Sequence, residues 1–181
     1  MPLLEDKLRK IRLLVLDVDG VLTDGSLIYG PQGEELKTFH VHDGLGINLA
    51  RQSGLRTAII TGRDSEIVAQ RARDLRIEPV LQGVRNKAAA LRDLAERLQL
   101  DLAEICYVAD DLNDLPAVRL AGAVVAVADA AAEVKAAADY VTTRPGGRGA
   151  VRETVEVILK AQGRWEQAVA GFVAKLEADG Q

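Results

Sequence analysis

The chain has 181 residues, of which 48% are hydrophobic and 28% are charged, values that fit one folded domain with a sizeable core and exclude a disordered chain. The formal net charge of -4 gives no general attraction for nucleic acid or for an anionic membrane, because both partners bind concentrated Lys and Arg. We therefore expect a small-molecule partner.

Cysteine usage and the N-terminal residues bear on the compartment. The single cysteine, Cys106, excludes an internal disulfide, and its apolar neighbours predict a small buried side chain. Residues 1–12 include acidic side chains and lack an apolar signal core, and no stretch approaches the roughly 20 apolar residues of a membrane span. We expect a cytoplasmic protein that does not act at a membrane.

Apolar, β-prone segments alternate along the chain with amphipathic segments. The expected strands are residues 11–18, 55–61, 78–83, 105–110 and 122–128, with a short edge strand at 139–143. The expected helices are residues 44–52, 65–75, 86–98, 114–120, 131–138, 147–162 and 164–180. Continuous apolar strands separated by helices are typical of a parallel sheet covered on both faces. The predicted fold class is a doubly wound α/β sheet.

Two segments depart from this alternation. Residues 26–41 hold two β-prone runs around "YGPQGE", which predicts a small β-hairpin that could project over a site. The last helix carries an apolar stripe made of Trp165, Val169, Phe172, Val173 and Leu176. This stripe can pack on its own domain or against another copy, and the sequence leaves both open. We divide the chain into a domain at residues 1–162 and a C-terminal helix and tail at residues 163–181.

Polar side chains gather where the expected strands end. They are Asp17 and Asp19 after the first strand, Thr61, Gly62 and Arg63 after the second, Lys87 at the helix after the third, and Asp110, Asp111 and Asp114 after the fourth. Because ligands bind beyond the carboxyl ends of parallel strands, these side chains are expected to converge on one site.

The residue types indicate phosphoryl transfer. Residues i and i+2 of an extended chain point the same way, so Asp17 and Asp19 can face one site while Gly20 allows a sharp turn. Close carboxylates repel one another unless a cation lies among them, and oxygen ligands suit Mg²⁺, although the pattern does not separate Mg²⁺ from Mn²⁺. A carboxylate could then approach phosphorus while Thr61, the Gly62 amide and Lys87 hold the phosphoryl oxygens.

Each cluster taken alone has a simpler interpretation. An Asp-x-Asp at a strand end is often a turn or a helix cap, and a helical lysine is usually solvated. The "ADDLND" segment could cap the helix that begins near Leu112 through Asp111 or Asn113. Independent caps have no reason to converge, so the four clusters together favour a catalytic site.

The segments "DVDGVLTDG", "IITGR", Lys87 and "VADDLNDLP" resemble, in order, the four signature motifs of the haloacid dehalogenase superfamily of phosphotransferases. The segments "GEELKTFHVHDGLGI", "ITGRDSEIVAQRARDLRI", "VLQGVRNKAAAL" and "PGGRGAVRE" are similar to its 3-deoxy-D-manno-octulosonate 8-phosphate (KDO 8-phosphate) phosphatase branch. The resemblance covers residues 10–160. It implies a Rossmann-like fold without a large cap domain and a cytoplasmic phosphatase of lipopolysaccharide precursor biosynthesis.

The resemblance also implies residue roles. Asp17 would be the nucleophile that forms an aspartyl phosphate, and Asp19 the general acid and then the general base. Mg²⁺ would be held by Asp17, the main-chain carbonyl of Asp19 and Asp110. Its waters or Lys87 would be oriented by Asp111 and Asp114. The phosphoryl group would be bound by Thr61 and Lys87. Ala109 stands where the family often has glycine. Members of this branch form tetramers in which hairpins and C-terminal segments of neighbours help close the site, so a homotetramer is expected.

Three further residues are candidates for substrate binding. Arg63 could bind a sugar-acid carboxylate. Relatives that act on nonulosonate 9-phosphates tend to have glutamate at this position. The alternative substrate is such a compound, a sialic acid or KDN 9-phosphate. His40 and His42 alternate on an expected strand, and without a third soft ligand nearby we expect one to face the site rather than a metal pair. Many branch members have arginine at the position of His42. Arg148 lies in "PGGRG", which could form an anion-binding nest or a flexible helix lead-in.

Two other kinds of protein also fit parts of the pattern. A receiver-like phosphorylation module combines strand-end aspartates, Thr and Lys on a doubly wound sheet, but it would not need Asp110 and Asp111 after the lysine. An inactive scaffold is disfavoured because all four clusters are intact. The motif order favours the enzyme.

Overall fold

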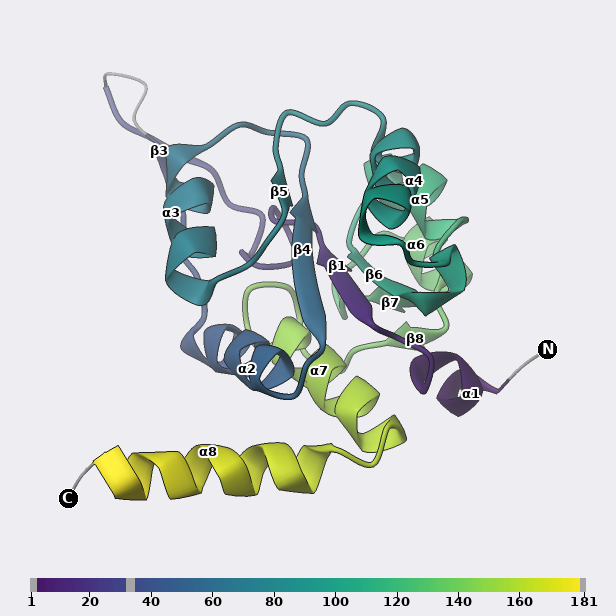
Figure 1. The fold of residues 1–181 in the computed structure, drawn as a ribbon. Coiled ribbons are helices and arrows are strands. Elements are labelled where there is room, and N and C mark those ends of the chain that lie inside the picture. Colours follow the sequence, from purple (N-terminus) through teal and green to yellow (C-terminus); the bar gives the residue numbers. More distant parts are fainter. Residues whose placement is uncertain (1–2, 32–34, 180–181) are drawn as a thin grey trace.

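The computed structural model describes residues 3–31 and 35–179, which form a six-stranded parallel sheet with helices on both faces (Figure 1). The strand order is β5-β4-β1-β6-β7-β8. The strands are β1 (Leu13–Leu16), β4 (Arg56–Ile60), β5 (Val80–Leu81), β6 (Ile105–Ala109), β7 (Ala123–Ala126) and β8 (Tyr140–Val141). The predicted doubly wound sheet is confirmed, including the short edge strand.

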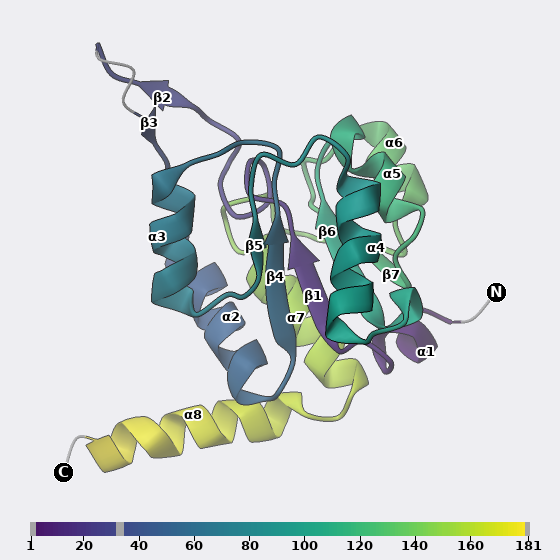
Figure 2. The same cartoon turned by 45° about the horizontal axis from the view of Figure 1, so that its top comes forward.

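The helices divide between the two faces of this sheet. They are α1 (Leu4–Leu8), α2 (Val41–Gln52), α3 (Glu66–Leu75), α4 (Lys87–Leu98), α5 (Leu115–Val118), α6 (Ala132–Ala137), α7 (Ala150–Ala161) and α8 (Trp165–Asp179), with 3-10 turns η1 (Leu102–Glu104) and η2 (Leu112–Asp114). Helices α2 and α7 pack together on one face, and α4, α5 and α6 gather on the other (Figures 1 and 2). Helix α1 was not predicted from the sequence.

Strand β1 lies at the centre of the core. All of its side chains are fully buried, and each contributes roughly 1.5–3 kcal/mol by leaving water. Leu16 pairs with Ile59 of β4 and with Val108 of β6. The three strands therefore end at nearly the same level, and the residues that follow them meet at one edge of the sheet.

The β-hairpin consists of β2 (Ile28–Tyr29) and β3 (Glu35–Leu36), which pair antiparallel. It projects away from the body of the molecule (Figure 2). Residues 32–34 of the predicted hairpin lie outside the described residues. Because Ile28, Tyr29 and Leu36 are exposed, most of the apolar surface of the hairpin faces solvent.

Helix α8 extends from the end of α7 along one side of the molecule (Figure 1). Its first turns pack on the core through Trp165 and Ala168, whereas Val173 and Leu176 are exposed. The first turns of the stripe therefore pack on their own domain, whereas its other end is open. Residues 1–2 and 180–181 lie outside the described part of the chain, and within that part no helix is long and apolar enough to cross a membrane.

The expected strand around His40 and His42 is wrong. His40 is the N-cap of α2, where its Nδ1 atom accepts a hydrogen bond from the backbone N–H of His42 at 3.3 Å. The helix therefore begins at Val41 rather than near Gly44, because a capping side chain satisfies its first turn. The prediction for Cys106 is confirmed, since it is a fully buried free cysteine whose burial raises the pKa of the thiol.

Candidate active site

A cavity of about 260 Å³ lies at the carboxyl edge of the sheet. The residues that line it are Asp17, Asp19, Gly25, Thr61, Gly62, Arg63, Asp110, Asp111 and Asn113. They come from the ends of β1, β4 and β6, which adjoin one another in the sheet. The predicted convergence of the strand-end clusters is confirmed.

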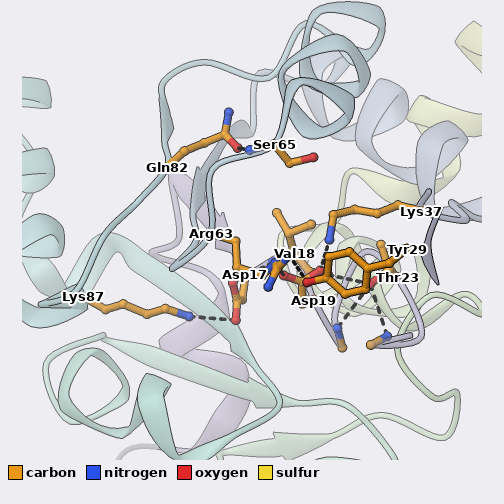
Figure 3. A network of polar contacts seen from close by, with 12 residues as sticks. Asp17, Val18, Asp19, Thr23, Tyr29, Lys37, Arg63, Ser65, Gln82 and Lys87 are labelled. Atoms are coloured by element: carbon orange, nitrogen blue, oxygen red, sulfur yellow. Dashed lines mark hydrogen bonds and ion pairs between the residues drawn. The ribbon is translucent and has the colours of Figure 1, made fainter. Parts of the chain in front are cut away.

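Lys87 joins two carboxylates beneath this cavity. Its Nζ atom donates hydrogen bonds to Asp17 Oδ2 at 2.7 Å and to Asp114 Oδ1 at 2.6 Å, and all three side chains are at most 5% exposed. Figure 3 shows Lys87 reaching toward Asp17 from the neighbouring helix. Burial alone would lower the pKa of Lys87, but the charges of Asp17 and Asp114 outweigh it and raise that pKa. The ammonium group therefore remains charged at neutral pH.

Asp114 is held by three donors. Besides Lys87, the Tyr107 hydroxyl donates to Asp114 Oδ1 at 3.0 Å, and the backbone N–H of Asp110 donates to Asp114 Oδ2 at 3.3 Å. Tyr107 was interpreted from the sequence only as part of a buried strand. A phenol inside an aliphatic strand needs a polar partner when buried, and that requirement was the available signal.

The carboxylates of Asp17, Asp110 and Asp114 form a cluster that fits a divalent cation. One oxygen from each lies within 4.8 Å of the others. Burial and the charge of Asp114 raise the pKa of Asp17 to about 6, and burial together with Asp17 and Asp114 raises the pKa of Asp110 to about 8. Asp110 Oδ1 is buried without a hydrogen-bond partner among the described residues. Both oxygens of Asp17 and both oxygens of Asp114 accept hydrogen bonds within the protein, so Asp110 Oδ1 is the buried oxygen of this cluster most available to a metal.

Two glycines allow the close packing around this cluster. Gly20 has φ +85°, and a Cβ atom there would lie 2.0 Å from Asp110 Oδ2. A Cβ atom on Gly146 would lie 1.7 Å from the Gly20 carbonyl oxygen. Thus the "PGGRG" segment packs directly on the turn that follows β1, and the backbone N–H of Gly147 donates to Val21 O at 2.9 Å.

Asp19 contacts two cations at the mouth of the cavity. Its Oδ1 atom forms an ion pair with Lys37, and its Oδ2 atom lies 3.7 Å from Arg63 Nε (Figure 3). Arg63 also donates through Nη2 to the Tyr29 hydroxyl at 3.0 Å. Lys37 and Tyr29 come from the hairpin region and were missed from the sequence, because no local pattern separates them from solvated residues.

The remaining predicted residues lie less centrally. Asp111 lines the cavity but is exposed, and it accepts a hydrogen bond from the backbone N–H of Leu112 at 2.7 Å, which confirms the alternative that it caps the following turn. Arg148 is exposed and lies 3.6 Å from Asp24. His42 lines a separate hollow of about 530 Å³ together with Tyr140 of β8 and several residues of α7. The structure therefore does not bring His42 or Arg148 to the acid cluster.

Comparison with known proteins identifies the family. Residues 77–152 match the model of the haloacid dehalogenase-like hydrolases. The 3-deoxy-D-manno-octulosonate 8-phosphate phosphatase of Escherichia coli K12 is 49% identical over 162 residues, which cover 90% of this chain and 86% of that protein. The chain belongs to the KDO 8-phosphate phosphatase family. The member from Haemophilus influenzae is 41% identical over 180 residues, which cover 98% of this chain and all of the relative.

Solved structures of KDO 8-phosphate phosphatases agree with the fold. The enzyme of Moraxella catarrhalis, in complex with magnesium, phosphate and KDO, is 45% identical with a TM-score of 0.91, covering 93% of this chain and 97% of that one. The cobalt-bound enzyme of Haemophilus influenzae is 41% identical with a TM-score of 0.87, covering 91% and 99%. Within this family fold, Ala109 ends β6 fully buried and pairs with Ala126, so the methyl group that replaces the frequent glycine is accommodated.

Proposed function

We propose that this chain is a Mg²⁺-dependent phosphomonoesterase that hydrolyses KDO 8-phosphate to KDO and inorganic phosphate through an aspartyl phosphate on Asp17. The observation that carries the proposal is the buried Asp17–Lys87–Asp114 array beside the unpartnered oxygen of Asp110. It provides a nucleophile, a fixed cation and metal ligands at one strand edge. The alternative, a nonulosonate 9-phosphate, is not favoured by the relatives, and neither is a receiver-like module.

The side chains around Asp17 have complementary binding roles in this proposal. Asp17, the main-chain carbonyl of Asp19 and Asp110 would hold Mg²⁺, with Asp111 and Asp114 supporting them. When bound, Mg²⁺ offsets the carboxylate charges and polarises the phosphoryl oxygens. Lys87, Thr61 and the Gly62 amide would bind the phosphoryl group as its charge redistributes.

The reaction would proceed in two transfers. A carboxylate oxygen of Asp17 forms a bond to phosphorus while the bond from phosphorus to the sugar oxygen breaks, and the proton of the Asp19 carboxyl group moves to that sugar oxygen. A water oxygen then bonds to phosphorus as Asp19 accepts its proton, and the bond between Asp17 and phosphorus breaks. Asp17 is thereby released as a carboxylate, and Asp19 is protonated again.

Arg63 is the proposed contact for the sugar acid. Its side chain is 40% exposed beside Asp19, and a guanidinium group suits a carboxylate. His42 and Arg148 stand outside the proposed site of this chain, because they lie at other surfaces.

We also propose a homotetramer in the cytoplasm, with residues 1–162 as the catalytic domain and residues 163–181 as a C-terminal helix and tail. Exposed apolar side chains on the hairpin and on α8 support assembly, because another copy could cover them: Leu27, Ile28, Tyr29, Leu36, Val173 and Leu176. The buried free thiol of Cys106 is consistent with a reducing compartment. Light scattering after size-exclusion chromatography tests the assembly, and a monomeric mass would contradict it.

Steady-state phosphate release tests the proposed reaction. KDO 8-phosphate and a nonulosonate 9-phosphate are compared with the purified enzyme, in the presence of Mg²⁺ and after chelation. The proposal expects preference for KDO 8-phosphate and loss of the reaction on chelation. Preference for the nine-carbon substrate would overturn the substrate, and undiminished rates without metal would overturn the metal requirement.

A further inference from the structure

The side chain of Lys37 is entirely buried at the base of the hairpin, where it forms an ion pair with Asp19 Oδ1. Figure 3 shows it approaching Asp19 from above, on the side opposite Lys87. The Asp19 side chain is 23% exposed and lines the active-site cavity. Lys37 thus contacts the proposed general acid without lining the cavity.

Burial separates the role of Lys37 from that of Arg63. The Arg63 side chain is 40% exposed, lines the cavity and lies 3.7 Å from Asp19 Oδ2. The Lys37 side chain is 0% exposed, and the residues lining that cavity do not include it. A buried ammonium group is costly unless it is paired. Lys37 is therefore placed to act on the Asp19 carboxyl group rather than on a substrate.

We infer that Lys37 is a positioning residue for Asp19, an inference that rests on the proposed phosphatase function. Lys37 occupies Oδ1 of the carboxyl group, so that Oδ2 is the oxygen that carries the proton to the sugar oxygen. A carboxyl group fixed in this way presents its O–H to the leaving group without first rotating. The hairpin thereby contributes to the chemical step through Lys37.

Substrates with different leaving groups test this role. A nitrophenolate leaves phosphorus without help from an acid, whereas a sugar alkoxide needs a proton. The value of kcat/KM covers steps up to the departure of the leaving group and so isolates the acid role of Asp19. The substrates are p-nitrophenyl phosphate, KDO 8-phosphate and mannose 6-phosphate, which has a sugar leaving group but no carboxylate.

The variant Lys37→Met keeps the length of the side chain and removes its charge. We expect its kcat/KM to fall at least tenfold more for both sugar phosphates than for p-nitrophenyl phosphate, since general acids typically contribute about 10²- to 10⁴-fold. Equal losses on all three substrates would indicate a structural role and overturn the inference. A loss confined to KDO 8-phosphate would indicate carboxylate recognition and would also overturn it.

A double-mutant cycle tests whether Lys37 acts through Asp19. In the Asp19→Asn background, adding Lys37→Met should change kcat/KM for the sugar phosphates by less than about twofold. Fully additive losses would contradict the inference. The matched control is Lys7→Met, which breaks a partly buried ion pair with Asp139 at 2.6 Å far from the site and should leave the ratio between substrates unchanged.

A second variant covers the case in which Lys37→Met fails to fold. Lys37→Arg keeps a cationic donor for Asp19 and should keep the ratio between sugar and aryl phosphates within about threefold of the native enzyme. A tenfold selective loss of sugar phosphate hydrolysis in that variant would overturn the inference. If the native enzyme cleaves mannose 6-phosphate but not KDO 8-phosphate, the proposed substrate is wrong, and the comparison with mannose 6-phosphate still decides the role of Lys37.

Discussion

Replacing Lys87 by Met removes the cation between Asp17 and Asp114 while keeping a side chain of similar length. The three side chains are 2%, 5% and 0% exposed, so both carboxylates would stay buried without their counter-ion. Breaking a buried ion pair typically costs about 3–5 kcal/mol. With about 2–4 °C of Tm per kcal/mol in a chain of this size, Tm should fall by about 6–20 °C. Catalysis should be lost as well, because Lys87 is the residue proposed to bind the phosphoryl group.

The loss of stability in Lys87→Met should depend on pH. Without the ammonium group the pKa of Asp17 rises further above about 6, so protonation relieves the buried charge more fully at pH 5 than at pH 8. Thermal unfolding in metal-free buffer at both pH values measures this difference. The control Lys7→Met breaks a pair whose side chains are 29% and 24% exposed, for which about 0–1 kcal/mol is expected. Equal losses for the two variants at pH 8 would refute the reasoning.

Further predictions concern the same cluster. Asp17→Asn should abolish turnover and keep the native circular dichroism spectrum; near-native activity would contradict the assignment of Asp17 as the nucleophile. The folded-state pKa values of Asp17 and Asp110 are raised to about 6 and about 8, so the metal-free protein should lose stability as pH rises from about 4 to about 8. In a thermal-shift assay, Mg²⁺ should therefore raise Tm more at pH 8 than at pH 5. A pH-independent Tm would argue against this account. Tyr107→Phe should cost about 1.5–3 kcal/mol in denaturant unfolding by removing a hydrogen bond to a charged carboxylate; no loss would mean that the bond is unimportant. Gly146→Ala should lower both Tm and kcat/KM, because its Cβ would lie 1.7 Å from Gly20 O; unchanged values would show that the segment can move aside.

The sequence predicted the strands because each is a short apolar run bounded by polar or turn residues. β1 and β6 are completely buried on both faces, so each is a continuous apolar run without alternating polar residues. In a parallel sheet the carboxyl ends of neighbouring strands share an edge, and this rule alone placed Asp17, Thr61 and Asp110 together.

The contacts that the sequence did not predict depend on tertiary structure. Lys37 is 18 residues from Asp19 in the chain, and only the path of the hairpin brings the two together. His40 was assigned to a strand as part of the β-prone hairpin segment, but its side chain instead caps α2. For Tyr107, unlike Lys37 and His40, the sequence did carry a signal, because a buried hydroxyl needs a polar partner. The identity of that partner could not be read from chain position alone.

The most direct test of the central claim is to locate the phosphoryl group during turnover. The enzyme is mixed with KDO 8-phosphate and Mg²⁺, quenched in acid and treated with borohydride, which reduces an aspartyl phosphate to homoserine, and the product is mapped by mass spectrometry. The proposed mechanism predicts homoserine at position 17 and nowhere else. Homoserine at another aspartate, or an unmodified chain under conditions in which phosphate is being released, would contradict it.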